Sequence, residues 1–313
     1  MAGEGHRLVV TARRELATDI VEFTLAAADG AVLPGFEPGA HVTVETPGGA
    51  MRRYSLVGSG AAPAAYVIAV KREPRSRGGS VAMHDHAPVG TVLTVLPPEN
   101  DFPLLDAARY VLIAGGIGIT PILGMARALR DACRPFRLIY CTRDAAGTAY
   151  AAEARALGAI IHHDGGDPAA HYDFWDDFAT PDPAARVYCC GPAPLMEEVR
   201  ALTGHWERSH VHFEDFKPVE VVRADDRAFK VTLARSGQRI EVPAGRTILE
   251  SLRAAGVRTV SSCESGTCGT CKTRLVSGTA DHRDMVLMPE EKDTHIMICV
   301  SRAAGEAGLV LDL

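Results

Sequence analysis

The sequence predicts a multidomain chain of mixed fold class, with an antiparallel β-barrel, a parallel α/β domain and a small α+β domain in that order. Three observations support this prediction. Short alternating segments fill the first part of the chain, strand and helix patterns alternate in the middle, and a cysteine-rich loop lies near the C-terminus. The 313 residues are long enough for two or three domains with their own cores.

The first 105 residues have the pattern of an antiparallel barrel. β-Branched and polar residues alternate in short segments at 8–16, 19–25, 40–46, 52–58, 66–73 and 91–97. Gly and Pro separate these segments, for example at Pro34-Gly35 and Pro97-Pro98. Many short strands joined by such turns are typical of a barrel, so we expect a β-barrel domain over residues 1–105.

Residues 106–220 have the pattern of a parallel sheet. Apolar segments at 110–114, 136–141, 159–163, 186–190 and 210–216 alternate with helices expected from Thr120, over 150–157 and from Pro194. This alternation is typical of a parallel sheet with helices on both faces. The apolar run 110–129 is long enough for a membrane helix, but Gly115, Gly116, Gly118 and Pro121 interrupt its middle. We therefore expect a strand, a turn and a helix there.

Polar residues 221–227 form the expected linker to a last domain over 228–313. This domain begins with expected strands at 229–235 and 238–244 and a helix at 247–255. Cys263, Cys268 and Cys271 then follow the spacing C-x4-C-x2-C, and Cys299 supplies a distant fourth thiol. This arrangement is typical of a plant-type 2Fe-2S cluster, a one-electron carrier. Zinc sites usually have two C-x2-C pairs or mixed Cys and His ligands, so zinc is the weaker interpretation.

Charge and termini exclude some classes of protein. A formal net charge of −6 argues against a nucleic-acid partner, which needs clustered Lys and Arg. The N-terminal residues lack the apolar core of a signal peptide, so we expect a cytoplasmic monomer without disulfides or a membrane anchor. The remaining cysteines are expected to be buried as small apolar residues: Cys133, Cys141, Cys189 and Cys190.

A cluster cannot accept a hydride, which carries two electrons, so a carrier supplied by a nicotinamide needs a flavin. Arg53, Tyr54 and Ser55 are candidates to pair with, stack on and hydrogen-bond a flavin, although the same residues suit an ordinary strand. The basic segment 71–77 leads into Gly78, Gly79 and Ser80 at the start of an expected helix. Backbone N–H groups there suit a terminal phosphate, and a solvated basic hairpin is the alternative.

Two glycine turns are candidates for a pyridine-nucleotide site. Each follows an expected strand, and ligands of open α/β sheets bind at that edge. The turns contain Gly115, Gly116, Gly118, Thr120 and Pro121 in the first, and Cys190, Gly191 and Pro192 in the second. The first turn departs from the G-x-G-x-x-G pattern.

Nucleotide preference depends on two residues that follow the strand at 136–141. Asp144 can bind a ribose diol and repel a 2′-phosphate, which favours NADH, whereas Arg143 has the opposite effect. A phosphate-sized site at Arg77 to Ser80, with no evident adenine shelf, favours FMN over FAD.

The sequence resembles the phthalate dioxygenase reductase family in five motifs and in their order. These are RYS at 53–55, GGS at 78–80, the turn GGIGITP, CGP at 190–192 and the cysteine loop SSCESGTCGTCK. DHRDMVL and the ending LVLDL extend the likeness to the whole chain. The resemblance implies an FMN-binding barrel, an NAD domain of the ferredoxin reductase type and a plant-type β-grasp ferredoxin domain.

The resemblance also implies the residues that contact FMN: Arg53, Tyr54, Ser55, Val70, Lys71, Gly79 and Ser80. It places Thr120 near the flavin and an aromatic of residues 211–216 against the ring. It thereby gives Ser55, Thr120 and Phe216 roles close to the reacting ring. As part of a final strand, these aromatics are equally consistent with core packing.

The resulting hypothesis is an oxidoreductase of aromatic-compound catabolism. Electrons would pass from NADH through FMN and 2Fe-2S to a terminal Rieske oxygenase. One alternative keeps the chemistry and changes the partner to an O-demethylase or amine monooxygenase. Another is a redox sensor, which would need an output module, and the sequence has no helix-turn-helix or basic helix.

Overall fold

The computed structural model divides the chain into two compact units, Met1–Glu214 and Asp215–Leu313. It describes residues 5–73, 79–216, 223, 225–261, 266, 269, 271–284, 286–305 and 308–313. The expected phosphate residues Arg77 and Gly78 and the expected ligands Cys263 and Cys268 lie outside these ranges.

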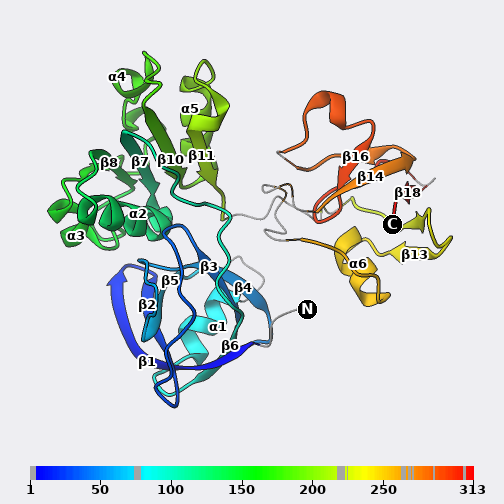
Figure 1. Cartoon of the computed structure of the whole chain (residues 1–313), viewed down its shortest axis with the longest axis horizontal. Coiled ribbons are helices and arrows are strands. Elements are labelled where there is room, and N and C mark those ends of the chain that lie inside the picture. The colour runs from blue at the N-terminus through cyan, green and yellow to red at the C-terminus, as the bar shows by residue number, and fades with distance from the viewer. Residues whose placement is uncertain are drawn as a thin grey trace. The chain divides into compact units, whose positions relative to one another are not determined.

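An antiparallel barrel forms the first part of unit 1 (Figure 1). Its strands among the described residues are β1 (His6–Ala17), β2 (Ile20–Ala27), β3 (His41–Glu45), β4 (Met51–Ser55), β5 (Ala65–Lys71) and β6 (Val92–Val95), in the order β4-β3-β6-β1-β2-β5. The outer strands meet where Leu56 bridges Ile68 and Val57 N donates to Val67 O over 2.9 Å. The predicted barrel is therefore confirmed, and the helix α1 (Gly79–His86) follows β5.

A five-stranded parallel sheet forms the rest of unit 1 within its described residues. Its elements are β7 (Arg109–Gly115), the 3-10 turn η1 (Gly116–Gly118), α2 (Ile119–Asp131), β8 (Phe136–Thr142), α3 (Ala151–Ala156), β9 (Ile160–His163), η2 (Pro168–Ala170), α4 (Trp175–Phe178), β10 (Ala185–Cys190), α5 (Ala193–Leu202), η3 (Arg208–His210) and β11 (Val211–Glu214). Every strand pair in this sheet is parallel, as the sequence predicts.

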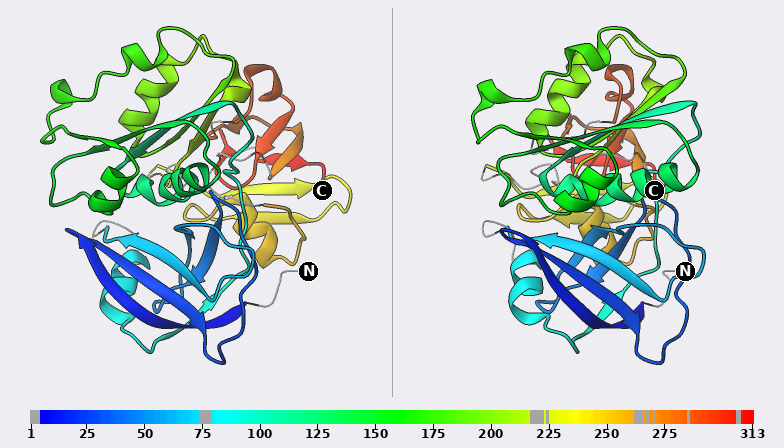
Figure 2. Two further views of the ribbon diagram at one scale, coloured as in Figure 1. Left: turned by 60° about the vertical axis from the view of Figure 1, so that its left-hand side comes forward. Right: turned by 90° about the vertical axis from the view of Figure 1, so that its left-hand side faces the viewer.

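Alternate strand residues reach opposite faces of this sheet, so two separate cores form. Leu112 packs in the core that contains the residues of α2, whereas Ile113 packs in the core that contains Met196 and Val199 of α5. Figure 2 shows the helices on the two sides of the sheet. No described helix of the chain is long and apolar enough to cross a membrane.

The strand order β11-β10-β7-β8-β9 reverses direction at β7. From β7 the chain proceeds outward to β8 and β9, then returns to the other side of β7 with β10. In open α/β sheets such a reversal leaves a crevice at the carboxyl ends of the two central strands, where ligands bind. The first predicted glycine turn follows β7, and the second follows β10.

Unit 2 is a mixed sheet with one short α-helix among its described residues. Its elements are β12 (Phe229–Leu233), β13 (Arg239–Val242), α6 (Ile248–Ala254), β14 (Lys272–Ser277), β15 (Ala280–Asp281), the 3-10 turn η4 (Pro289–Glu291), β16 (His295–Met297), β17 (Arg302–Ala303) and β18 (Leu309–Leu311). The order is β13-β12-β18-β14-β16, with β12 and β18 parallel. Thr247 and Glu250 form a capping box that starts α6, which packs Leu249 and Leu252 into the core. This is the β-grasp arrangement expected for residues 228–313.

One expectation about cysteines is wrong. Cys189 and Cys190 are buried in β10, but Cys133 is exposed and Cys141 is only half-buried. Cys133 follows the end of α2 with a φ of 52°, a left-handed conformation common just after a helix. A residue at that position faces away from the core, so its apolar character does not bury it.

Candidate functional site

Strand β4 places its two arginines on opposite faces, because successive side chains of a strand alternate. Arg52 lies across the start of α1: a Cβ atom at Gly79 would lie 2.7 Å from Arg52 Nε. The N-terminus of a helix and a guanidinium group together favour a phosphate. Arg52 is therefore the arginine beside the predicted phosphate site, a residue that was not among those predicted to contact the flavin.

Arg53 belongs to a charged group on the other face of β4. Its Nη2 donates to Asp101 Oδ2 over 2.5 Å and lies 3.0 Å from His41 Nδ1. His41 is buried, and its Nε2 lies 3.6 Å from a carboxylate oxygen of Glu99. This guanidinium is thus held by Asp101, and a contact between Arg53 and a flavin remains a prediction.

Three buried polar atoms near these arginines have no hydrogen-bond partner among the described residues: Tyr54 Oη, Ser55 Oγ and Glu214 Oε2. Buried polar groups normally have partners, so these atoms are candidates for contact with a ligand. Strand alternation puts Tyr54 on the face of Arg52 and Ser55 on the face of Arg53, and Glu214 lies near Arg53. The observation supports the FMN site predicted for the barrel.

Glu214 is the last residue of β11 and was not predicted as a site residue. Burial raises its pKa to about 8; Arg53 acts to lower it and Asp101 to raise it. The sequence signal was a single carboxylate at the end of an otherwise apolar strand, VHFE. A neutral carboxyl group beside a charged pair can donate or accept a proton near neutral pH.

The elements around the predicted phosphate site are joined through α1. Val70 and Lys71 end β5, and His84 of α1 bonds through Nε2 to Val70 O over 2.9 Å. Ser80, in the first turn of α1, accepts a hydrogen bond at Oγ from Glu73 N over 3.0 Å. The structure therefore brings Val70, Lys71, Gly79 and Ser80 to one end of β5, and their contact with FMN remains a prediction.

The two predicted nucleotide turns pack directly on each other. A Cβ atom at Gly118 would lie 2.1 Å from Cys190 O, and one at Gly115 would lie 2.5 Å from Pro192 Cδ. These glycines are required by packing between the turns. Gly116 has a φ of 54° and would meet nothing within 4 Å, so its backbone is open to a ligand.

The first turn continues into α2 with two buried residues, Thr120 and Pro121. Thr120 Oγ1 donates to Ile117 O over 3.0 Å, which closes the turn before the helix. The hydroxyl group is thus used within the turn, and its proximity to a flavin remains a prediction. Gly191, between Cys190 and Pro192, would also clash with Gly115 if it carried a Cβ atom.

Arg143 and Asp144 lie just after β8 and are exposed. Asp144 Oδ1 accepts a hydrogen bond from Gly147 N over 2.8 Å, so the carboxylate closes its own turn. Arg143 lies against Gly166. Phe216, two residues beyond β11, is 41% exposed and belongs to unit 2.

The described part of the cysteine site has two buried thiols. Cys271 precedes β14 and is 3% exposed, and Cys299 follows β16 and is 1% exposed. Gly266 and Gly269, which lie between Cys263 and Cys271 in the sequence, have φ values of 77° and 82°, which strongly favour glycine. A Cβ atom at Gly266 would lie 2.8 Å from Val300 Cγ2, so Gly266 abuts the turn that carries Cys299.

Comparison with known proteins agrees with this geometry. Residues 231–304 match the 2Fe-2S iron-sulfur cluster binding domain. The chain is 51% identical to phthalate dioxygenase reductase of Burkholderia cepacia over 98% of this chain and 97% of the relative. It is 39% identical to the vanillate O-demethylase oxidoreductase of a Pseudomonas strain, over 98% and 99%.

A solved structure described as phthalate dioxygenase reductase, a modular structure for electron transfer from pyridine nucleotides to 2Fe-2S, is also similar. It superimposes with a TM-score of 0.83 and 51% sequence identity, and covers 99% of this chain and 98% of that one. The likeness therefore includes the barrel, the parallel sheet and the cysteine domain. This chain belongs to the phthalate dioxygenase reductase family.

Proposed function

We propose that this chain is the NADH-dependent reductase component of a phthalate-type Rieske dioxygenase, with FMN and a 2Fe-2S cluster as its cofactors. The observation that carries the proposal is 51% identity to a phthalate dioxygenase reductase over 98% of the chain, which includes every predicted site. Bound FMN would supply the chemistry of accepting two electrons together and releasing them singly, and the cluster would supply one-electron transfer.

The residues of unit 1 bind and orient the flavin and the pyridine nucleotide. Arg52 and the first turn of α1 hold the flavin phosphate, and Tyr54 and Ser55 offer their unpartnered hydroxyl groups to the ring. The two packed glycine turns receive the pyridine nucleotide at the reversal of strand order. Contacts from Arg53, Thr120 and Phe216 to the flavin are part of the same proposal.

In unit 2 the four cysteines Cys263, Cys268, Cys271 and Cys299 hold the cluster, and the terminal oxygenase receives its electrons. The protein is proposed to work as a monomer, because one chain carries a complete set of predicted sites. The cytoplasm is proposed as its location. A demethylase is the second candidate partner, supported by the 39% identity to a vanillate O-demethylase oxidoreductase. The higher identity favours a phthalate-type dioxygenase.

Reconstitution tests the proposal. The purified protein, NADH and a phthalate dioxygenase oxygenase component should form dihydroxylated product faster than the same reductase with a vanillate O-demethylase oxygenase. Faster turnover with the demethylase would reject the proposed partner and leave the electron-transfer chemistry intact. A comparison of kcat/KM for NADH and NADPH tests nucleotide preference, and an NADPH preference would reject the role given to Asp144.

A further inference from the structure

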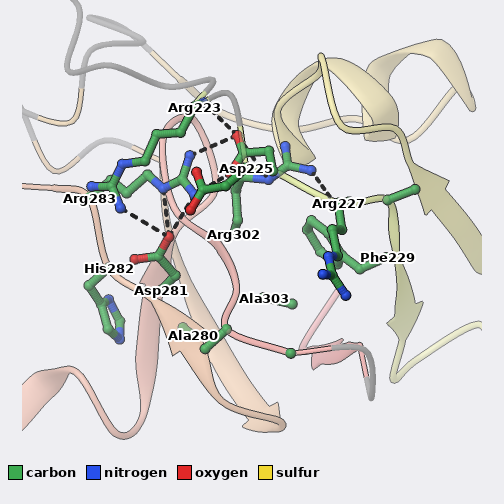
Figure 3. A pocket seen from close by; sticks show the side chains of 14 residues that line it. Arg223, Asp225, Arg227, Phe229, Ala280, Asp281, His282, Arg283, Arg302 and Ala303 are labelled. Carbon is green, nitrogen blue, oxygen red and sulfur yellow. Dashed lines mark hydrogen bonds and ion pairs between the residues drawn. The ribbon is translucent and has the colours of Figure 1, made fainter.

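A buried network of charged side chains lies in unit 2, apart from the cysteines. Figure 3 shows Arg283, Arg302 and Asp281 together at a surface pocket. The carboxylate of Asp226 lies between the two arginines: Arg283 donates to Oδ1 and Oδ2 over 2.5 and 3.0 Å, and Arg302 Nε lies 3.6 Å from Oδ2. The side chains of Asp226, Arg283 and Arg302 are at most 4% exposed.

Asp226 compensates two cations that are removed from water. Burial acts to raise the pKa of Asp226, but hydrogen bonds from Arg283 and the charges of both arginines hold this pKa below its usual range. Arg302 is fixed further, because it donates to the backbone oxygens of Arg227, Pro243 and Arg246. Arg283 also pairs with Asp281 over 2.6 Å, whereas Arg302 pairs with Asp226. Loss of the Asp226 carboxylate would therefore leave Arg283 with Asp281 alone and deprive the buried guanidinium group of Arg302 of its ion pair, which is destabilising.

The network continues by hydrogen bonds to the turn that carries Cys299. Arg283 N donates to Ser301 Oγ over 3.1 Å, and Ser301 Oγ donates to Asp284 Oδ1 over 3.3 Å. Asp284 Oδ2 in turn accepts from Leu287 N over 2.8 Å. Ser301 is fully buried and only two residues beyond Cys299. The segments around Arg283 and Cys299 are therefore held together side by side.

Two described glycines of the cysteine loop, Gly266 and Gly269, lie close to these segments. A Cβ atom at Gly266 would lie 3.3 Å from Asp284 Cα and 2.8 Å from Val300 Cγ2. A Cβ atom at Gly269 would lie 3.4 Å from Val286 Cγ1. Any movement between the segments would alter the space left for the loop, because close-packed interiors transmit such shifts.

We propose that Asp226 is a positioning residue for the iron-sulfur cluster. By joining Arg283 to Arg302, it holds the 281–284 and 299–302 segments at the spacing that the cysteine loop requires. Asp226 precedes the residues 231–304 that match the iron-sulfur domain, so the domain pattern does not include it. The inference rests on the proposed function, since it requires a cluster at the four cysteines.

Asp226→Asn in the full-length holoprotein tests the proposal, because the substitution keeps the size of the side chain and removes its charge. The matched control is Asp225→Asn, which neutralises the exposed neighbouring carboxylate. We expect Asp226→Asn to shift the EPR g-values of the reduced cluster and to release the cluster on the order of tenfold faster in urea. Asp225→Asn should match the wild type in both measurements.

Two further variants keep the test decisive. Arg283→Lys retains the charge but loses the two-pronged bond, so it should produce a smaller change of the same kind, and it replaces Asp226→Asn if that variant does not fold. Asp226→Asn combined with Arg283→Gln removes one charge of each sign and should release the cluster more slowly than Asp226→Asn alone.

The outcomes separate this inference from the proposed function. An unchanged EPR spectrum in a folded Asp226→Asn or Arg283→Lys protein would overturn the positioning role, even if the variant unfolds at lower urea, because a purely structural role leaves the folded cluster site unaltered. A wild-type protein with no 2Fe-2S EPR signal would instead refute the proposed function. A wild-type signal with unchanged variants refutes only the role of Asp226.

Discussion

At the scale of single residues, adjacent positions in β4 have different surroundings. Arg52 lies against the start of α1, whereas Arg53 bonds to Asp101 and lies beside His41. This difference arises because successive side chains of a strand point to opposite faces. It could have been predicted from the sequence, since the same rule puts Arg52 and Tyr54 on one face. We therefore expect a phosphate bound at the start of α1 to depend on Arg52.

Arg52→Ala should weaken FMN binding by about 10- to 100-fold, the loss expected for one charge-assisted hydrogen bond. Fluorescence titration of the flavin-free protein with FMN measures the affinity. Arg14→Ala is the matched control, because it removes an arginine of the same barrel that is paired with Glu22 and has no proposed part in the flavin site. If Arg14→Ala weakened binding as much as Arg52→Ala, the assignment of the phosphate to Arg52 would be wrong.

Glu214 gives a prediction about pH. Its pKa is raised to about 8 in the folded protein from an ordinary value near 4.5, chiefly by burial. Between these values the unfolded chain is ionised at this position while the folded chain keeps its proton. The contribution of Glu214 to the free energy of unfolding is therefore largest below about pH 4.5. It decreases as the pH rises and is lost above about pH 8.

Glu214→Gln is uncharged throughout this range, so the wild type should lose stability relative to the variant between pH 5 and 8. Urea unfolding of the flavin-free protein, followed by tryptophan fluorescence, measures this, because Trp175 and Trp206 both lie in unit 1. A difference between the two proteins that does not vary over this pH range would contradict the raised pKa of Glu214.

At the scale of elements, the packed glycine turns after β7 and β10 give a matched pair of substitutions. Gly118→Ala should lower the free energy of unfolding by about 1–3 kcal/mol or more and weaken NADH binding, because its Cβ would collide with Cys190 O. Gly116→Ala should lower the free energy of unfolding by less, about 1–2 kcal/mol, because only its left-handed backbone is strained. Thermal unfolding and NADH titration compare the two variants. A larger loss of stability in Gly116→Ala than in Gly118→Ala would reject the packing role of Gly118.

Local pattern predicted most elements of unit 1, because each strand there is a continuous apolar or alternating segment. Strand order was not predictable in the same way. The neighbours β7 and β10 are about 70 residues apart in sequence, and no local pattern records their pairing. In unit 2, the strands β14, β16 and β18 were not predicted, since they are short and defined by distant partners such as Val231 with Leu309.

The candidate site was predictable where its residues stand in a motif. The glycine turns and the cysteine spacing are of this kind. Arg52, Glu214 and Asp226 were missed because their roles arise from burial and from partners far away in sequence, such as Arg53 for Glu214 and Arg283 for Asp226. Cys133 was misjudged for the same reason, since exposure at a helix end is a property of the fold.

At the scale of the whole molecule, the two compact units divide the proposed chemistry. Unit 1 contains the predicted flavin and nucleotide residues apart from Phe216, and unit 2 contains the four predicted cluster ligands. Hydride transfer should therefore not need the cluster, whereas delivery to the oxygenase should need it. A substitution at one cysteine can separate these two halves of the electron path.

Cys299→Ser should damage the cluster, because a buried thiolate is replaced by a poor iron ligand, and should leave the flavin residues intact. NADH should still bleach the flavin at the wild-type rate in stopped-flow absorbance, and a quinone acceptor should still be reduced. Oxygenase-coupled turnover should fall to the background rate on the same preparation. Normal flavin content together with normal oxygenase turnover in this variant would show that electrons reach the oxygenase without the cluster, and the assigned path through unit 2 would be wrong.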